Sequence, residues 1–347
     1  MCVLVSLSSV FISIAAVHVH MTERNPAGSP LEAAAGGTDP RAAEAFELLA
    51  NETRLAILLA LWDAYEPFTS SGGVTFSELR ERVGGPDSGQ FNYHIGKLKG
   101  KLIRSTDEGY KLRPAGEKII RAVIAGSGLE TPSLEPTEVA MSCPRCGAST
   151  AITYQSGRLF QLCTECGGNF DETDDLPQGT LYAWRFEPAG LVGRTPEEMY
   201  RAASLGMIHR ALALIDGVCP ECFGTVDTEV NICENHNPED EDVCSNCGRQ
   251  DEILTLYECS VCKYTGGAAP SDIVSQHPAV IAFYYDRGVD FQYDLDFREV
   301  KRVVELEATH QQTLESTDPV RINVTIQYED EGLALLLDEE MNVLEVN

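Results

Sequence analysis

The chain has 347 residues, more than one hydrophobic core ordinarily supports, so we expect two or three domains. It carries 54 Asp and Glu against 26 Lys and Arg, and this formal charge of -28 argues against a surface that binds polyanions everywhere. Acidic, lysine-poor surfaces are typical of proteins that work in molar salt, where the Debye length is about 3 Å and local contacts decide DNA binding. The composition therefore predicts a halophilic protein; the alternative is a protein that avoids polyanions altogether.

Residues 1–40 are predicted to be a disordered leader. Residues 3–17 form an uncharged apolar run that resembles the core of a signal peptide, but no basic residue precedes it. Such a run is also too short to span a bilayer comfortably. Because Met21 begins a polar stretch rich in Ala, Gly, Pro and Glu, we expect residues 1–20 to come from a mis-called start codon. A membrane anchor is the alternative.

Residues 41–125 are predicted to form one domain that begins with two helices. Apolar side chains predict a first helix over residues 41–49, and Asn51 can cap a second helix. The core stripe of this second helix is expected to comprise Leu55, Leu58, Leu59 and Trp62.

Two short helices joined by a tight turn follow. Thr75 and Glu78 form the capping-box pattern that begins a third helix, which is expected to end at the glycine pair 84–85. Asp87 begins a fourth helix, and Gly100 ends it. Two short helices joined by a glycine-rich turn are typical of a helix-turn-helix.

The fourth helix separates into an apolar face and a polar face. Phe91, Ile95 and Leu98 recur at i, i+4 and i+7 and are expected to point inward. The outward residues are then Ser88, Gln90, Asn92, Tyr93, His94, Lys97 and Lys101. Asn and Gln can pair with adenine, and Lys can reach guanine or phosphate. This face therefore predicts a recognition helix in the major groove, although Tyr93 and His94 taken alone could equally be packing residues.

A short hairpin is predicted after this helix and would form the wing. Residues 102–104 and 110–112 are its strands, with a turn at 107–109, and Arg104 and Lys111 are further candidates for DNA contact. Residues 75–113 contain eight basic and five acidic side chains, a local net charge of +3 in an acidic chain. This is the electrostatic pattern of a nucleic-acid interface; docking of a protein or dimerisation is the alternative.

Residues 48–58, LLANETRLAIL, resemble the opening of the ArsR-type winged-helix repressors. Residues 109–112 with Ala115 and Gly116 resemble the wing and following helix of that family, so the resemblance covers residues 41–125 and implies a winged-helix DNA-binding domain. The metal sensors of the family carry paired cysteines on the third helix, where this chain has residues 76–80, FSELR, and metal sensing there is not implied. The acidic wing tip at Asp107 and Glu108 is a second departure, and it counts against wing contacts with phosphate.

The remaining layout resembles a haloarchaeal group of winged-helix proteins with C-terminal zinc ribbons. Of twelve cysteines, ten fall in five Cys-x-x-Cys pairs, the spacing of metal-binding knuckles in a reducing compartment. A linker is expected at residues 126–140, with Pro132 and Pro136, and a zinc ribbon at 141–176 with a turn at 155–158. Four thiolates would close its tetrahedral zinc site, and they are Cys143, Cys146, Cys163 and Cys166.

Residues 217–266 contain eight further ligands, enough for two ions. Residues 223–232 separate the first two ligand pairs, alternate as a strand, and would span about 33 Å when extended, so these pairs cannot share an ion. Residues 248–258 also resemble a strand, and the two can run antiparallel. We therefore expect one zinc at Cys219, Cys222, Cys259 and Cys262 and another at Cys233, His236, Cys244 and Cys247. Sequential pairing is the alternative, and Asp or water could replace His236.

A strand and a helix are expected to connect the ribbons over residues 177–216. Thr195 and Glu198 again form a capping-box pattern, and the apolar stripe that follows comprises Met199, Ala203, Met207, Ala211 and Leu214. We interpret this stripe as core packing, with homodimerisation as the alternative, and His209 as structural.

A C-terminal antiparallel β region is predicted over residues 267–347. Residues 280–285 form a buried strand or helix whose period is ambiguous, and core packing is preferred over an effector pocket there. Strands are expected at residues 321–328, 333–337 and 341–346.

Together these patterns predict an α+β multidomain protein of the cytoplasm. An enzyme is not expected, because every zinc would have four protein ligands and no phosphate-binding loop or Ser-His-Asp grouping is evident. The expected function is sequence-specific regulation of transcription, with double-stranded DNA as partner and three structural zinc ions. The alternative is a zinc-ribbon scaffold or accessory factor of the transcription machinery without its own DNA specificity.

Overall fold

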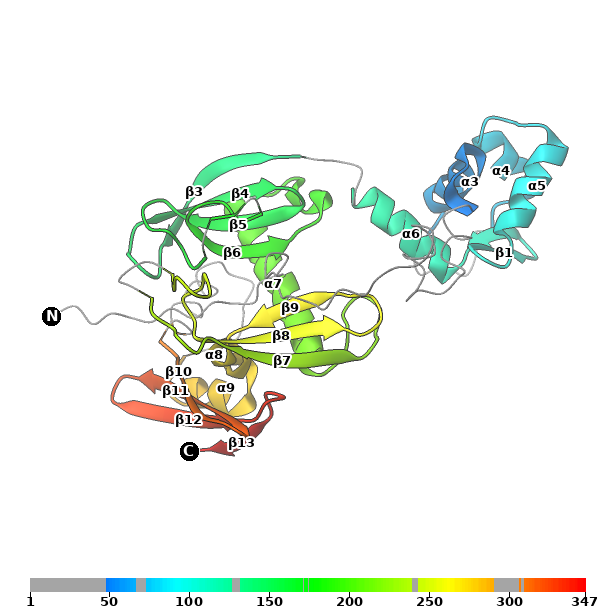
Figure 1. The fold of residues 1–347 in the computed structure, drawn as a ribbon. Coiled ribbons are helices and arrows are strands. Elements are labelled where there is room, and N and C mark those ends of the chain that lie inside the picture. Colours follow the sequence, from blue (N-terminus) through cyan, green and yellow to red (C-terminus); the bar gives the residue numbers. More distant parts are fainter. Residues whose placement is uncertain are drawn as a thin grey trace, which may run out of the picture. The chain divides into compact units, whose positions relative to one another are not determined.

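The computed structural model describes residues 48–66, 73–126, 132–170, 172–173, 175–238, 243–289, 306 and 309–347. These residues belong to two compact units that meet in sequence between residues 129 and 130. The fold is mixed α+β with several antiparallel sheets (Figure 1). The predicted leader and most of the predicted first helix lie outside the described residues. In the described part, every helix is too short or too polar to cross a lipid bilayer.

The described residues of the first unit form several helices and a hairpin. These elements are α3 (Glu52–Asp63), α4 (Phe76–Arg82), α5 (Ser88–Leu98), β1 (Ile103–Thr106), β2 (Gly109–Leu112) and α6 (Pro114–Ile124). Side chains cap α3, α4 and α5 as expected. The side-chain oxygens of Asn51, Thr75 and Asp87 accept hydrogen bonds from backbone N–H groups of the first turn. These caps define the residue at which each of the three helices begins.

The core stripe of α3 differs from the predicted one. Leu55 and Leu59 are 37% and 44% exposed, whereas Ile57, Leu58 and Leu61 are buried among α4, α5 and the hairpin. The expectation for Leu55 and Leu59 was therefore wrong. All these positions are apolar, so the sequence alone does not show which side of the helix faces the core.

The hairpin has a neighbour that the sequence pattern did not reveal. Val74 and Tyr110 exchange two backbone hydrogen bonds, of 3.0 and 2.8 Å, so the chain before α4 pairs with β2. Gly109 makes this approach feasible, because its φ is +133° and an added Cβ would lie 2.3 Å from the Val74 carbonyl oxygen. The pairing attaches the hairpin to the helices.

The second unit begins with a four-stranded antiparallel sheet in the order β3-β4-β5-β6. Its strands are β3 (Leu134–Ser142), β4 (Ser149–Gln155), β5 (Arg158–Cys163) and β6 (Thr180–Arg185). The linker expected up to residue 140 is therefore shorter than predicted. Pro136 fits into β3 because β3 is an edge strand whose register shifts between Leu134 and Thr137.

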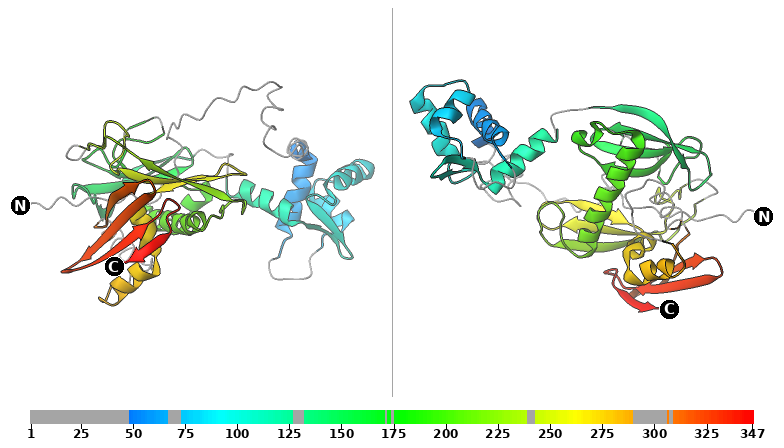
Figure 2. Two further views of the ribbon diagram at one scale, coloured as in Figure 1. Left: turned by 60° about the horizontal axis from the view of Figure 1, so that its bottom comes forward. Right: turned by 180° about the vertical axis from the view of Figure 1, so that it is seen from behind.

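Helix α7 (Pro196–Ile215) packs against this sheet and extends beyond it, after the short helix η1 (Pro188–Leu191). A reciprocal capping box between Thr195 and Glu198 begins α7. Met199, Ala203 and Met207 belong to the core under the first sheet, whereas Leu214 belongs to the next core along the chain. The predicted stripe is thus buried along its whole length, and one helix joins two sheets (Figures 1 and 2).

Two further sheets complete the second unit. The three-stranded sheet is β7 (Val226–Ile232), β8 (Ile253–Cys259) and β9 (Thr265–Ala268). The four-stranded sheet is β10 (Gln311–Thr317), β11 (Val320–Tyr328), β12 (Glu331–Leu337) and β13 (Val343–Val346). Helices α8 (Pro270–Ile273), η2 (Val274–Gln276) and α9 (Pro278–Tyr285) share one apolar core with both sheets. The predicted β region therefore also contains helices, and its ambiguous apolar run is α9.

Candidate metal centres and nucleic-acid interface

The first candidate metal centre lies at the end of the first sheet. Cys143 follows β3 and Cys163 ends β5, so the hairpin places the two knuckles together. The Sγ atoms of Cys143 and Cys166 are 3.7 Å apart, and those of Cys146 and Cys163 are 3.5 Å apart. Four sulfurs at about 2.3 Å from one tetrahedral zinc lie about 3.8 Å from each other. The spacing of this set is therefore compatible with zinc.

Backbone geometry in this centre favours bound thiolates. The N–H groups of Glu165 and Cys166 donate to Cys163 Sγ at 3.3 and 3.2 Å, which stabilises negative charge on that sulfur. Burial raises the pKa of the Cys143 thiol and raises that of Cys166 to about 11. Thiolates at these buried positions at neutral pH therefore require a nearby cation, which a metal ion supplies.

The second centre contains Cys219, Cys222, Cys259 and Cys262. Their Sγ atoms are 3.5 Å apart for Cys219 and Cys262 and 3.6 Å apart for Cys222 and Cys259. Each pair sits in the same kind of turn, because Phe223 and Lys263 both have φ of +62°. The antiparallel pairing of β7 with β8 brings the two turns together, with Val226 opposite Cys259.

The third centre lies at the opposite end of the β7–β8 pair, where Ile232 stands opposite Ile253. Cys233 Sγ is 4.0 Å from Cys244 Sγ, and Cys247 Sγ is 3.6 Å from His236 Nδ1. All four ligand atoms lie within 4.8 Å of one another. In the structure, the first ligand pair of residues 217–266 thus lies with the last pair, and the second pair lies with the third. This is the pairing predicted from the length of the extended strands, and the alternative pairing of consecutive pairs is not found.

His236 has the environment of a metal ligand. Its Nε2 lies 2.8 Å from the backbone oxygen of Gln250, so an Nε2–H can donate there and leave Nδ1 free to bind. The backbone N–H of Asn237 donates to Cys244 Sγ at 3.4 Å. The Asn237 side chain takes part as well, because its Oδ1 lies 3.1 Å from Cys244 Sγ. Sequence patterns did not indicate these roles of Gln250 and Asn237. Residues 239–242, between His236 and Cys244, are outside the described part.

Helix α5 presents most of the predicted DNA-contacting residues to solvent. Those that are exposed are Ser88, Gln90, Asn92, Tyr93 and Lys97, and Lys101 is exposed just beyond the helix. Phe91, Ile95 and Leu98 are buried in the core as expected. Lys97 Nζ lies 5.6 Å from the centre of the Tyr93 ring, one turn away. The exposed face therefore combines amide, aromatic and cationic groups.

His94 does not belong to this face, and its assignment as outward was wrong. Its side chain is 6% exposed and packs with the core residues of α5. Burial, and then the nearby Arg54 charge, lower its pKa, so the imidazole is held neutral. The position lies at i+3 from Phe91, which is part of the inward stripe of a helix.

The hairpin carries the remaining candidates. Arg104 in β1 is exposed, and Lys111 in β2 is half-buried with its Nζ 3.7 Å from Glu108 Oε2. Asp107 and Glu108 are both exposed at the tip between the strands. The cationic character of the hairpin is thus offset at its tip.

Two family models match parts of this chain. A model described as a domain of unknown function, DUF7347, matches residues 42–123, which include the helices and hairpin of the first unit. A second model of the same description, DUF7351, matches residues 140–343, which include all three candidate metal centres. No curated protein and no solved structure matches the chain. Because its model spans more than half of the chain, this protein belongs to the DUF7351 family.

Proposed function

We propose that this protein is a sequence-specific DNA-binding regulator of transcription. In this proposal the first unit is a winged helix that resembles the ArsR type, with α5 in the major groove and β1–β2 as the wing. The observation that carries it is the exposed face of α5, where Gln90, Asn92 and Lys97 stand opposite a fully buried apolar face. Amide and ammonium groups at the beginning of such a helix can contact base edges.

The turn before α5 supports this use of the helix. Gly84 and Gly85 have φ of +90° and +64°, which lets the chain reverse tightly between α4 and α5. Arg80 Nε donates to the Pro86 carbonyl oxygen at 2.8 Å and holds this turn. Two short helices, α4 and α5, joined by such a tight turn support the proposal of a helix-turn-helix.

The distribution of charge also supports a DNA-binding first unit. Residues 1–131 carry 15 acidic and 13 basic side chains, whereas residues 132–347 carry 39 and 13. The excess acidity therefore lies almost entirely in the second unit, and residues 75–113 have a net charge of +3. In molar salt, where charges separated by more than about 3 Å are screened, the acidic unit would not repel the duplex.

The three metal centres are proposed to be structural zinc sites of a cytoplasmic protein. Each set offers four side-chain ligands, so a bound zinc has no open position for water and supplies folding energy instead of catalysis. His236 with three cysteines and the two sets of four cysteines are all common zinc environments. The proposal therefore assigns no enzymatic activity to these centres.

Selection of binding sites from a randomised duplex library, at high salt, tests the proposed function. The wild-type chain is expected to enrich a common sequence, and the triple variant Q90A/N92A/K97A is expected to lose it, because each lost base contact costs about 1–3 kcal/mol. Lys118→Ala, an exposed lysine on α6, serves as the matched control and should enrich the wild-type sequence. Retention of that sequence by the triple variant would exclude α5 as the recognition helix.

A scaffold function has one observation in its favour. Phe223 and Val261, one in each of the two turns of the second metal centre, are 82% and 63% exposed. Large apolar side chains displayed in this way are found at protein-binding surfaces. An accessory factor of the transcription machinery would lose co-purification with RNA polymerase in the variant F223N/V261N, whereas a DNA-binding regulator would keep its selected DNA sequence.

A further inference from the structure

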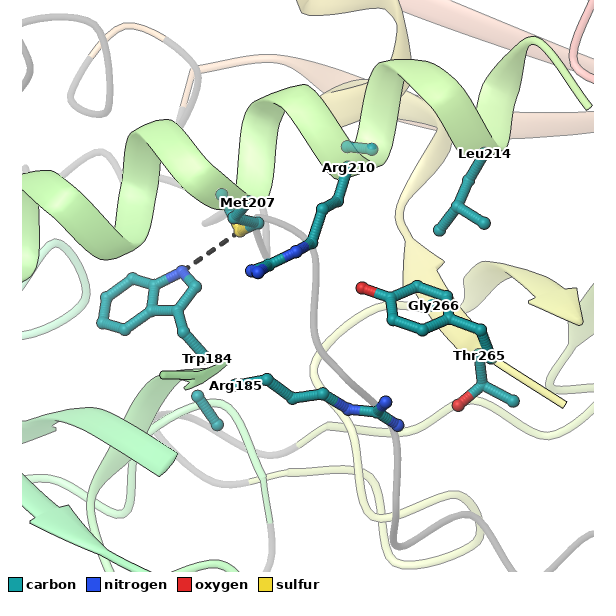
Figure 3. Close-up of a pocket in the computed structure, with 10 residues that line it drawn as sticks. Trp184, Arg185, Met207, Arg210, Leu214, Thr265 and Gly266 are labelled. Atoms are coloured by element: carbon teal, nitrogen blue, oxygen red, sulfur yellow. Dashed lines mark hydrogen bonds between the residues drawn. The ribbon is translucent and has the colours of Figure 1, made fainter. Parts of the chain in front are cut away.

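The second unit contains a pocket between β6, α7 and the start of β9. It is an open pocket whose volume, counting the solvent at its mouth, is about 380 Å³. Its floor is apolar and buried, and consists of Ala183, Trp184, Met207, Ala211, Leu214 and Gly266. The indole N–H of Trp184 donates to Met207 Sδ at 3.1 Å, which fixes one wall (Figure 3).

Cationic and hydroxyl groups surround the mouth of this pocket. Figure 3 shows Arg210 entering from α7 and Arg185 from the end of β6, with Thr265 beside them. The Arg185 guanidinium carbon lies 5.0 Å from the centre of the Tyr264 ring, so the planar cation stacks over an aromatic face. Both arginines, the Thr265 hydroxyl and the Tyr264 phenol thus belong to the lining of one pocket.

Two arginines in the lining of one pocket are unusual for this part of the chain. Residues 132–347 carry three times as many acidic as basic side chains, yet two of the thirteen basic ones line this single pocket. The pocket therefore combines local cationic character with an apolar floor.

We propose that this pocket binds a small organic carboxylate with a planar apolar body. The Arg210 guanidinium would pair with the carboxylate, because guanidinium forms bidentate hydrogen bonds with that group, and Arg185 would add positive charge at the mouth. The apolar body would lie on the floor formed around Trp184, Met207 and Leu214. Neither the DNA-binding proposal nor the identity of the metal enters this inference.

The fluorescence of Trp184 provides the test. The chain has two tryptophans, so the variant Trp62→Phe leaves Trp184 as the single emitter inside the proposed site. Benzoate is the probe, benzamide has the same body without the charge, and inorganic phosphate has charge without the body. We expect saturable quenching by benzoate with a Kd in about the millimolar range or tighter. Binding by the other two should be at least about tenfold weaker, a difference of about 1.4 kcal/mol.

Matched variants locate the binding to this pocket. Arg210→Met should weaken benzoate binding about tenfold or more, and Ala211→Leu, which fills the cavity, should remove it. Arg194→Met is the control, because Arg194 is exposed, lies outside the pocket and donates to the Gly190 carbonyl oxygen at 2.8 Å.

Four results would overturn the proposal. They are no saturable response to benzoate, equal binding of benzamide, equal binding of phosphate, and unchanged affinity in Arg210→Met with its Trp184 emission intact. Because the assay contains no DNA, a failure here leaves the DNA-binding proposal in place. A failed DNA selection likewise leaves the pocket proposal in place.

Discussion

The two units of this chain are stabilised internally in different ways. The first unit is near electrical neutrality and folds around an apolar core that joins its helices to the β1–β2 hairpin. The second unit carries most of the negative charge, and all three metal-ligand clusters found among the described residues belong to it. Crowded like charges destabilise a compact state. Metal ions bound at these clusters would offset this cost in the second unit.

Metal removal should give the largest difference in stability between the two units. Structural zinc contributes about 10–16 kcal/mol in small domains, which is as large as the whole stability of a typical domain. A strong chelator should therefore unfold the second unit and leave the first folded. Trp184 in β6 and Trp62 in α3 report on the two units separately in the single-tryptophan variants W62F and W184F.

The expected result is a red shift of Trp184 emission on chelation, reversed by added zinc, with no change in Trp62 emission. A matching shift in both variants would show that the units unfold together. No shift in either would show that the clusters do not stabilise the fold.

A buried histidine should make the stability of the second unit depend on pH, and this effect should be of intermediate size. His310 is 2% exposed, its Nε2 lies 3.0 Å from the Tyr284 hydroxyl, and its Nδ1 lies 3.2 Å from the Ser271 carbonyl oxygen. Burial lowers its pKa to about 4, below the usual value of about 6.5 for an unfolded chain. The unfolded state therefore takes up a proton first as the pH falls.

The stability that neutral His310 contributes is present above about pH 6.5 and is lost as the pH falls towards about 4. Wild type should lose about 2–3 kcal/mol more than His310→Asn between pH 7 and pH 4.5, in denaturant unfolding followed by Trp184. Metal release at low pH affects both proteins alike. Identical pH profiles would contradict a buried neutral imidazole at this position.

The tip of the β1–β2 hairpin, the proposed wing in the first unit, should have the smallest effect on DNA affinity. Glu108 pairs with Lys111 at 3.7 Å, and Asp107 is exposed beside it. In the double variant D107N/E108Q the tip would no longer repel phosphate, so affinity for the selected duplex should rise by less than about 1 kcal/mol. Fluorescence anisotropy at several salt concentrations measures this change, and weaker binding would show that the tip favours the complex.

The sequence predicted the features that depend on spacing. The Cys-x-x-Cys pairs and the two strand-like runs between them sufficed to predict the crosswise ligand sets, because extended strands hold their ends far apart. Residues that cap helices were also predictable, since Asn51, Thr75, Asp87 and Thr195 are good N-cap types followed by apolar periodicity.

Features that depend on tertiary packing were not predictable. Leu55 and Leu59 are as apolar as Leu58, so only the position of the neighbouring helices decides which of them is buried. The run at residues 280–285 is apolar on every side and has no period, although Pro278 at the first turn marks α9. Strand β3 contains Pro136 and resembles a linker, and it is a strand because β4 pairs with it.

The central claim is that α5 reads base pairs, and crosslinking in living cells tests it most directly. The tagged wild-type protein and the variant Q90A/N92A/K97A would be crosslinked to DNA at native salt and mapped across the genome. The account predicts sharp occupancy at a limited set of promoters for the wild type and its loss in the variant, with equal protein levels. Identical maps for the two proteins, or wild-type signal that follows RNA polymerase without a shared sequence, would contradict it.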